Sequence, residues 1–141
     1  MKKFFSITYN PLILDVWLLL LRLGVGAFML THGLPKLERL LEGNAQGFPD
    51  PIGLGATLSL VLTIFAEVIC SVLIMLGLAT RLASLPLIFT MLVAVFIVHV
   101  DDPFSRMEMG LLYLLIYFTL LVLGSGKYSV DRFISGGRGR K

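Results

Sequence analysis

The chain has 141 residues, of which 57% are hydrophobic and only 15% are charged. Soluble domains are closer to half apolar and about a quarter charged, so this composition excludes an ordinary soluble domain. The formal net charge of +3 is small. The basic residues gather near the two chain ends, which favours membrane headgroups rather than nucleic acid as their partner.

Four apolar blocks follow one another along the chain and are separated by short polar stretches. A helix needs about 20 apolar residues to cross the hydrocarbon layer, and each block reaches or approaches this length. The blocks must be helices, because an isolated strand in lipid would leave its backbone groups without hydrogen bonds. We therefore predict an all-α fold, a bundle of four transmembrane helices in one membrane domain over residues 1–141. The predicted spans are about 12–34, 53–79, 82–100 and 106–125, followed by a basic tail at 127–141.

Basic residues predict the orientation of this bundle. In a four-helix topology the N-terminus, the turn between the second and third spans and the C-terminal tail share one side. That side carries eight basic residues: Lys2, Lys3, Arg81, Lys127, Arg132, Arg138, Arg140 and Lys141. The opposite side carries three, Lys36, Arg39 and Arg106. Because basic residues are retained in the cytoplasm, both termini are predicted to be cytoplasmic.

Two ionisable residues interrupt the first two spans, Arg22 in the first and Glu67 in the second. A charge at the bilayer centre costs at least about 2.5 kcal/mol on insertion scales, so each needs compensation. The outer end of the first span is taken at Leu34, just before Pro35, and Arg22 lies about 18 Å from it along the helix. Glu67 lies about 20 Å from the outer end of the second span. We therefore predict an Arg22–Glu67 ion pair at mid-membrane. The pair either fixes helix packing, or binds a polar ligand or relays protons.

A second group of polar residues lies at the outer ends of the spans. His32 and Lys36 are four residues apart and share a helix face, and His99 ends the third span beside Asp101 and Asp102. These side chains either line a pocket at the outer mouth or are simply polar helix ends among the headgroups. Histidine titrates near neutral pH and is a candidate proton carrier. The spacing matches no metal-ligand motif, so we predict no metal site.

Several short motifs follow one another in a fixed order. They are residues 21–24 (LRLG), 32–33 (HG), 36–37 (KL), Glu67, 77–83 (GLATRLA) and 124–131 (GSGKYSVD). Together they resemble the signatures of the DoxX family, over most of the chain from about Trp17 to Phe133. Ser125 stands where the family often has proline. No single motif is specific, but their order and spacing are.

The resemblance to DoxX implies a four-helix, multi-pass protein of the bacterial inner membrane that is linked to redox chemistry. Relatives include a small subunit of thiosulfate:quinone oxidoreductase and a membrane anchor in a complex with superoxide dismutase and a thiosulfate sulfurtransferase. The sequence itself contains neither a haem-ligand pair at matched depth nor a flavin motif. The redox role is therefore an expectation from the family. We expect a redox-associated subunit that contacts the lipid bilayer, has protein partners in a redox complex, and binds quinone or a small sulfur or oxygen species in the bundle.

The expected ligand-binding residues are Arg22, Glu67, His32, Lys36 and His99. Arg22 or Lys36 would hold an anion or a quinone carbonyl. Glu67, His32 and His99 are the candidate catalytic residues, because each would accept or donate a proton. The alternative is a non-enzymatic membrane anchor, scaffold or small transporter, in which the deep charges serve only the architecture. No nucleic-acid partner is expected.

Overall fold

The structure, a computed structural model, describes residues 10–136. Over this range it is helical without strands, in the order α1 (Pro11–Leu41), α2 (Ala56–Ile64), η2 (Phe65–Cys70), α3 (Ser71–Leu76), α4 (Thr80–Val93), η3 (Ala94–Val98), α5 (Phe104–Leu123) and α6 (Val130–Ile134). The η segments are π-helical parts of longer helices, so α2, η2 and α3 form one span and α4 and η3 form another. Within residues 10–136, four helices are thus long and apolar enough to cross a membrane, which confirms the predicted fold class.

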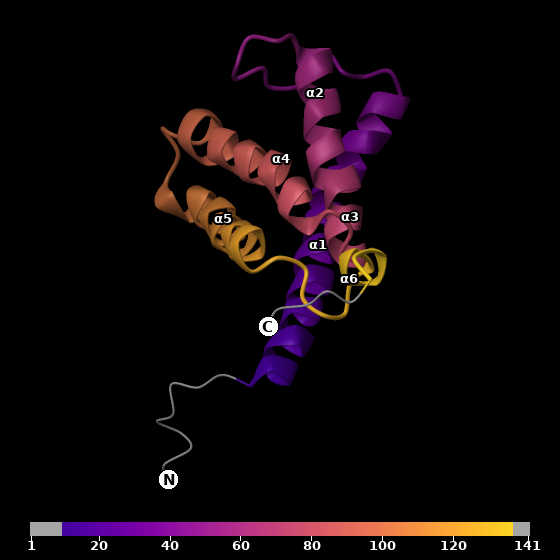
Figure 1. The fold of residues 1–141 in the computed structure, drawn as a ribbon. Helices are drawn as coiled ribbons and strands as arrows, with labels where there is room; N and C mark the ends of the chain where they lie inside the picture. The colour runs from indigo at the N-terminus through magenta and orange to yellow at the C-terminus, as the bar shows by residue number, and fades with distance from the viewer. Residues whose placement is uncertain (1–9, 137–141) are drawn as a thin grey trace.

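The four spans alternate in direction along the chain (Figure 1). α1 packs beside the α2–η2–α3 span, and α4 and α5 form a closely packed pair. We call the end that holds the start of α1, the α3–α4 turn and α6 the terminal side. The end with the α1–α2 and α4–α5 connections is the loop side. Which side is cytoplasmic stays a prediction, and five residues behind it lie outside the described range: Lys2, Lys3, Arg138, Arg140 and Lys141.

α1 extends beyond the first predicted span because proline does not end it. The helix begins after Asn10, whose side chain accepts a hydrogen bond from a first-turn backbone N–H at 2.9 Å, and Pro11 occupies its first position. Pro35 lies inside the helix, which continues to Leu41. A proline removes one backbone hydrogen bond, and transmembrane helices tolerate this loss where neighbouring groups compensate for it. The extension makes Lys36 part of α1.

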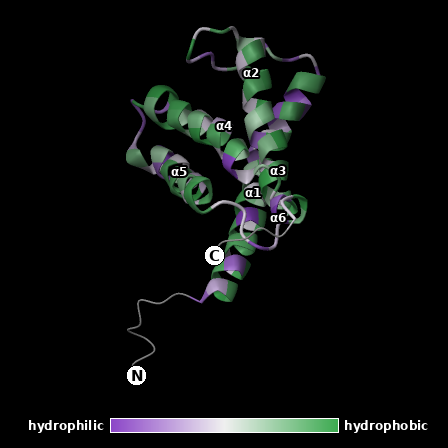
Figure 2. Cartoon of the chain, in the orientation of Figure 1, coloured by the Kyte–Doolittle hydropathy of each residue, from purple (hydrophilic) through white to green (hydrophobic). Residues whose placement is uncertain are grey.

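The interior of the bundle and its exterior are both apolar. Buried side chains come from all four spans and include Leu18, Val25, Met29, Cys70, Ile74, Leu87, Met91, Leu114 and Leu120. Large apolar side chains also face outward, among them Trp17, Phe28, Phe89 and Leu115. Figure 2 shows hydrophobic residues along all the long helices, whereas hydrophilic residues lie in the connections and at a few positions on the helices, several of them on α1. This exterior suits lipid acyl chains, because water would disfavour so large an apolar surface.

Two charged side chains order the α1–α2 connection. Arg39 Nε donates a hydrogen bond to the carbonyl oxygen of Asn44 at 2.8 Å. Asp50 accepts a hydrogen bond from the Ser59 hydroxyl at 2.7 Å and from two backbone N–H groups just before α2, at 2.9 and 2.7 Å. These hydrogen bonds, the one from Ser59 first, hold the pKa of Asp50 below its ordinary value. Asp50 thereby tethers the connection to the start of α2.

Candidate functional site

Glu67 forms its ion pair with Lys36. Lys36 Nζ lies 2.6 and 2.5 Å from the two carboxylate oxygens of Glu67. The Glu67 side chain is 4% exposed and that of Lys36 is 29% exposed. A carboxylate this deeply buried needs a cation beside it, and Lys36 supplies that cation. The predicted Arg22–Glu67 pair is therefore wrong.

Two local features bring Glu67 close to α1. Glu67 lies in η2, and π-helical segments of this kind are frequent at functional sites. Gly33 of α1 packs directly against it. A Cβ atom at Gly33 would lie 3.0 Å from Glu67 Cβ and 2.8 Å from Val68 Cγ2. Because Gly33 has no side chain, α1 can approach η2 closely enough for Lys36 to reach the carboxylate.

Arg22 lies toward the terminal side of the bundle. It precedes Gly33, which is level with Glu67, by eleven residues, or about 16 Å along the helix. The Arg22 side chain is fully buried. Its Nη1 donates a hydrogen bond to the carbonyl oxygen of Ile74 at 3.4 Å, and its Nη2 donates to that of Tyr128.

The surroundings of Arg22 unite three sequence motifs in one structural contact. Asp131 accepts hydrogen bonds from the backbone N–H groups of Ala79 at 2.7 Å and Thr80 at 3.2 Å, and so caps the first turn of α4. Its own backbone N–H donates to the carbonyl oxygen of Gly77 at 2.9 Å. A side chain at Gly77 would collide with the Arg22 guanidinium. We call this contact of α1, the α3–α4 turn and the C-terminal segment the terminal-side junction.

The depths of the two charges differ because the helix ends differ from the predicted ones. Arg22 lies 19 residues before Leu41, the observed loop-side end of α1. Glu67 lies 11 residues after Ala56, the loop-side start of its own span. At ~1.5 Å per residue these positions are about 28 and 16 Å from the loop-side ends. The two charges therefore lie at different depths, and each has another partner.

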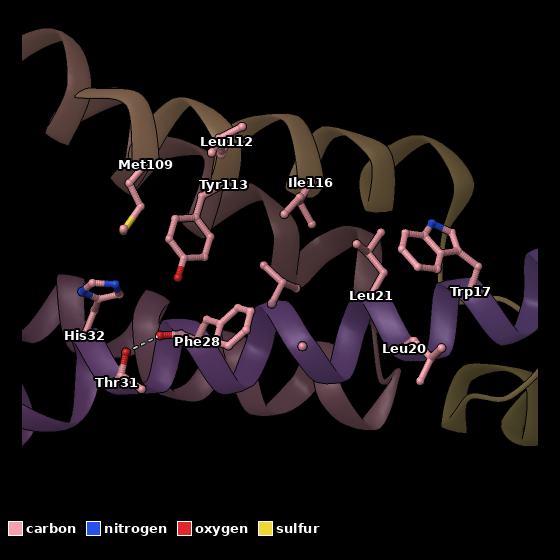
Figure 3. Close-up of a pocket in the computed structure, with 12 residues that line it drawn as sticks. Trp17, Leu20, Leu21, Phe28, Thr31, His32, Met109, Leu112, Tyr113 and Ile116 are labelled. Atoms are coloured by element: carbon pink, nitrogen blue, oxygen red, sulfur yellow. Dashed lines mark hydrogen bonds between the residues drawn. The ribbon is translucent and has the colours of Figure 1, made fainter. Parts of the chain in front are cut away.

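A pocket of about 530 Å³ lies between α1 and α5 (Figure 3). Its lining is largely apolar: Trp17, Leu20, Leu21, Gly24, Val25, Phe28, Thr31, His32, Met109, Leu112, Tyr113 and Ile116. Figure 3 shows His32 and Tyr113 toward one end, with the Tyr113 hydroxyl directed at α1, and Trp17 toward the other. Gly24 stands in the wall, and a Cβ atom there would meet no other atom within 4 Å. The pocket is therefore an elongated apolar groove with one polar end.

Aromatic contacts link the polar end of the pocket to the bundle centre. The rings of His32 and Tyr113 meet edge to face, with centroids 6.0 Å apart, and Tyr113 stacks on Tyr117 at the same distance. Gly33, which follows His32 on α1, packs directly against Glu67. The structure thus brings His32, Lys36 and Glu67 into one region with Tyr113. Of the predicted ligand-binding residues, His32 lines the pocket, whereas Arg22, Lys36, Glu67 and His99 do not.

His99 belongs to a separate polar cluster at the α4–α5 connection. Its Nδ1 lies 2.6 Å from Asp102 Oδ2, and Arg106 Nη1 lies 3.6 Å from the same oxygen. The hydrogen bond from His99 is the main reason why the pKa of Asp102 lies below its ordinary value, and Arg106 adds to the effect. Charged side chains commonly pair in this way at the exposed ends of helices, and such pairs contribute little to stability.

Most pocket residues are apolar and stand out little in the sequence of a membrane helix. One face of α1 carries Trp17, Gly24 and Phe28 at helical spacing. The two large aromatic rings on either side of a glycine are the only sequence signal that distinguishes this face from the rest of the helix. Tyr113 becomes a site residue through its position opposite that face on α5. Over residues 10–136, no three His, Cys, Asp or Glu side chains gather as metal ligands.

Two comparisons with known proteins found a match to this chain. The model of the DoxX family matches residues 17–100, a range that includes Arg22, His32, Lys36 and Glu67. A curated protein of Bacillus subtilis (strain 168), named "Putative oxidoreductase CatD", is 33% identical over 125 residues, which cover 88% of this chain and 91% of the relative. No solved structure matches this chain.

Proposed function

Because the chain belongs to the DoxX family, we propose that it is a redox-associated membrane subunit that binds a quinone between α1 and α5. The observation that carries the proposal is the apolar pocket with His32 and Tyr113 at one end. The name of the Bacillus subtilis relative, which refers to an oxidoreductase, supports a redox role. The bacterial inner membrane is the proposed location, as the family resemblance implies.

The chemistry of the pocket suits a quinone. Ligand pockets for small molecules typically enclose about 300–1,000 Å³ and combine apolar walls with a few polar groups. A quinone carries two carbonyl oxygens on a flat ring and a long apolar tail. The Tyr113 hydroxyl and a His32 ring N–H can donate to a carbonyl, while the tail follows Phe28, Gly24 and Trp17 along α1. Trp17 and Phe28 are more than half exposed, so the tail can enter from the lipid.

Small anions fit the same pocket poorly. Its lining contains no lysine or arginine among residues 10–136. Lys36 pairs with Glu67, and Arg22 is held in the terminal-side junction. Transferring an anion into an apolar groove without a cation costs several kcal/mol or more. A quinone is therefore favoured over a charged sulfur species such as thiosulfate, and a protein partner would exchange electrons with it.

The single tryptophan provides the test, because Trp17 lines the pocket and bound quinones quench indole fluorescence. Purified protein in detergent is titrated with a short-tailed quinone, and saturable quenching is expected. Tyr113→Phe is expected to weaken binding about threefold to tenfold, which corresponds to one hydrogen bond of 0.5–1.5 kcal/mol. Gly24→Leu fills the pocket without a backbone clash and is expected to abolish saturation.

Tyr128→Phe is the matched control, because Tyr128 lies outside the pocket lining and contacts Arg22 only through its backbone oxygen. This variant is expected to bind as the parent protein does. Quenching that rises linearly with quinone and is the same in Gly24→Leu would reflect partition into detergent and refute the proposal.

A non-enzymatic anchor or scaffold is the second candidate function, and one observation favours it. Arg22 and Asp131, which belong to the family-like motifs, hold the terminal-side junction together and do not line the pocket. Retention of a redox protein complex by Gly24→Leu, together with unchanged quinone turnover in that complex, would support this candidate.

A further inference from the structure

The short helix α6 lies at the level where the second span ends and the third begins. The backbone N–H of Asp131 donates to the carbonyl oxygen of Gly77, in the α3–α4 turn, at 2.9 Å, and Figure 1 shows α6 beside the end of α3. The span from Ala56 to Leu76 has 21 residues and so a length of about 30 Å, which matches the hydrocarbon layer. Gly77 therefore lies near the terminal-side boundary of that layer, and α6 lies there with it.

Large apolar side chains of α6 are left uncovered at this boundary. Phe133 is 88% exposed and Ile134 is 68% exposed, and Tyr128, just before α6, is 42% exposed. Aromatic and aliphatic side chains at the edge of a bilayer favour the zone between acyl chains and headgroups over water. Because no part of residues 10–136 covers Phe133, this face suits contact with lipid.

Basic side chains accompany this apolar face. Lys127 and Arg132 lie in the same segment, and Arg81 lies in the first turn of α4, which Asp131 caps. Among residues 10–136, these three basic side chains form no ion pair with a carboxylate. The carboxylates of Asp15 and Asp131 instead accept hydrogen bonds from backbone N–H groups. The surface around α6 therefore presents positive charge to the headgroup layer.

We propose that residues 127–134, together with Arg81, bind anionic phospholipid. Phe133 and Ile134 insert beside the acyl chains, while Lys127 and Arg132 bind the phosphate groups. Basic residues beside a span attract anionic lipids, and an arginine can donate two hydrogen bonds to one phosphate. A zwitterionic headgroup carries its own ammonium group, which competes for the phosphate, so anionic lipid is preferred. The sequence continues with further basic residues that add to this attraction: Arg138, Arg140 and Lys141.

Brominated lipids test the site, because bromine on an acyl chain quenches a tryptophan that it contacts. Trp17→Phe removes the single natural tryptophan, and Phe133→Trp places a probe on α6, where the exposed ring has few neighbours to displace. The protein is reconstituted in vesicles of equal parts phosphatidylcholine and phosphatidylglycerol, with bromine on only one of the two lipids. Brominated phosphatidylglycerol is expected to quench the probe at least about twofold more strongly than brominated phosphatidylcholine.

Charge removal separates the headgroup contact from the apolar contact. Lys127→Gln/Arg132→Gln, added to the probe variant, is expected to keep the quenching by phosphatidylcholine and to lose the preference for phosphatidylglycerol. Phe104→Trp in the same tryptophan-free background is the matched control. Phe104 is 63% exposed at the loop-side start of α5, with the acidic residues Asp102 and Glu108 close to it in sequence. Phosphatidylglycerol is expected to quench this probe no more strongly than phosphatidylcholine does.

Equal quenching of the α6 probe by the two lipids would overturn the preference for anionic lipid. A probe that neither lipid quenches would show that water or another protein covers α6, and would overturn the lipid contact itself. A preference that survives Lys127→Gln/Arg132→Gln would overturn the role of these two side chains. The measurement uses no quinone, so each result is independent of the function proposed above.

Discussion

The Lys36–Glu67 pair predicts an unequal response to removal of its two charges. Lys36→Met leaves a carboxylate with a side-chain exposure of 4% without a cation, and breaking a buried pair in this way costs about 3–5 kcal/mol of unfolding free energy. Glu67→Gln leaves an ammonium group that is 29% exposed. Because that group can turn toward loop-side water on its flexible stem, we expect a smaller cost of about 1–2 kcal/mol.

The double variant Lys36→Met/Glu67→Gln removes both charges and keeps the side-chain volumes. Replacing a buried ion pair by neutral groups is often close to neutral, so we expect a cost of about 0–2 kcal/mol. The two single effects then exceed the double effect by roughly 4–5 kcal/mol, which is the coupling free energy of the pair. Reversible unfolding in mixed detergent micelles, followed by circular dichroism, measures all four species.

The matched control is the partly exposed pair of His99 and Asp102, whose side chains are 36% and 31% exposed. His99→Gln and Asp102→Asn are expected to show a coupling of less than about 1 kcal/mol. Additive effects at Lys36 and Glu67, or an equal cost for the two single variants, would refute the assignment of Glu67 as a buried carboxylate that depends on Lys36.

Three further predictions follow from local contacts. Gly33→Ala would place a Cβ atom 3.1 Å from the backbone carbon of Glu67 and is expected to lower the unfolding temperature. Gly24→Ala has open space around its Cβ atom and is expected to leave the unfolding temperature unchanged. Thermal melts of the two variants compare these effects directly. Asp131→Asn weakens the cap on α4 by about 1 kcal/mol, which predicts roughly fivefold faster proteolysis of the C-terminal segment. An unchanged cleavage rate would contradict the role of Asp131 in holding the terminal-side junction together. Folding lowers the pKa of Asp50 from its ordinary value of 3.8. Ionised Asp50 therefore stabilises the α1–α2 connection fully when the pH is above 3.8. This stabilisation is lost as the pH falls through the lower pKa of the folded state. Hydrogen exchange of this connection, corrected for intrinsic rates, is expected to show that acid step in the parent protein and not in Asp50→Asn.

Local composition was enough to predict the number and type of the spans. A run of about 20 apolar residues has few alternatives to a membrane helix, because each backbone group in lipid must be paired within its own segment. The same reasoning identified Glu67 as a buried charge and drew attention to His32 and Lys36, since ionisable residues in such spans are rare. The DoxX motifs likewise identified the family from their order alone.

The partners of the buried charges were decided only by the tertiary structure. If the predicted end of a helix is wrong by one residue, the predicted position of a side chain relative to that end is wrong by about 1.5 Å along the helix axis and about 100° around it. α1 continues through Pro35, and its packing against Glu67 at Gly33 brings Lys36 rather than Arg22 to the carboxylate. The pocket needs α1 and α5, which are separated by more than 60 residues of sequence, to lie beside each other. Helical hydrophobicity is a local property that a sequence displays directly, whereas helix register and the gaps between helices arise from packing between distant segments.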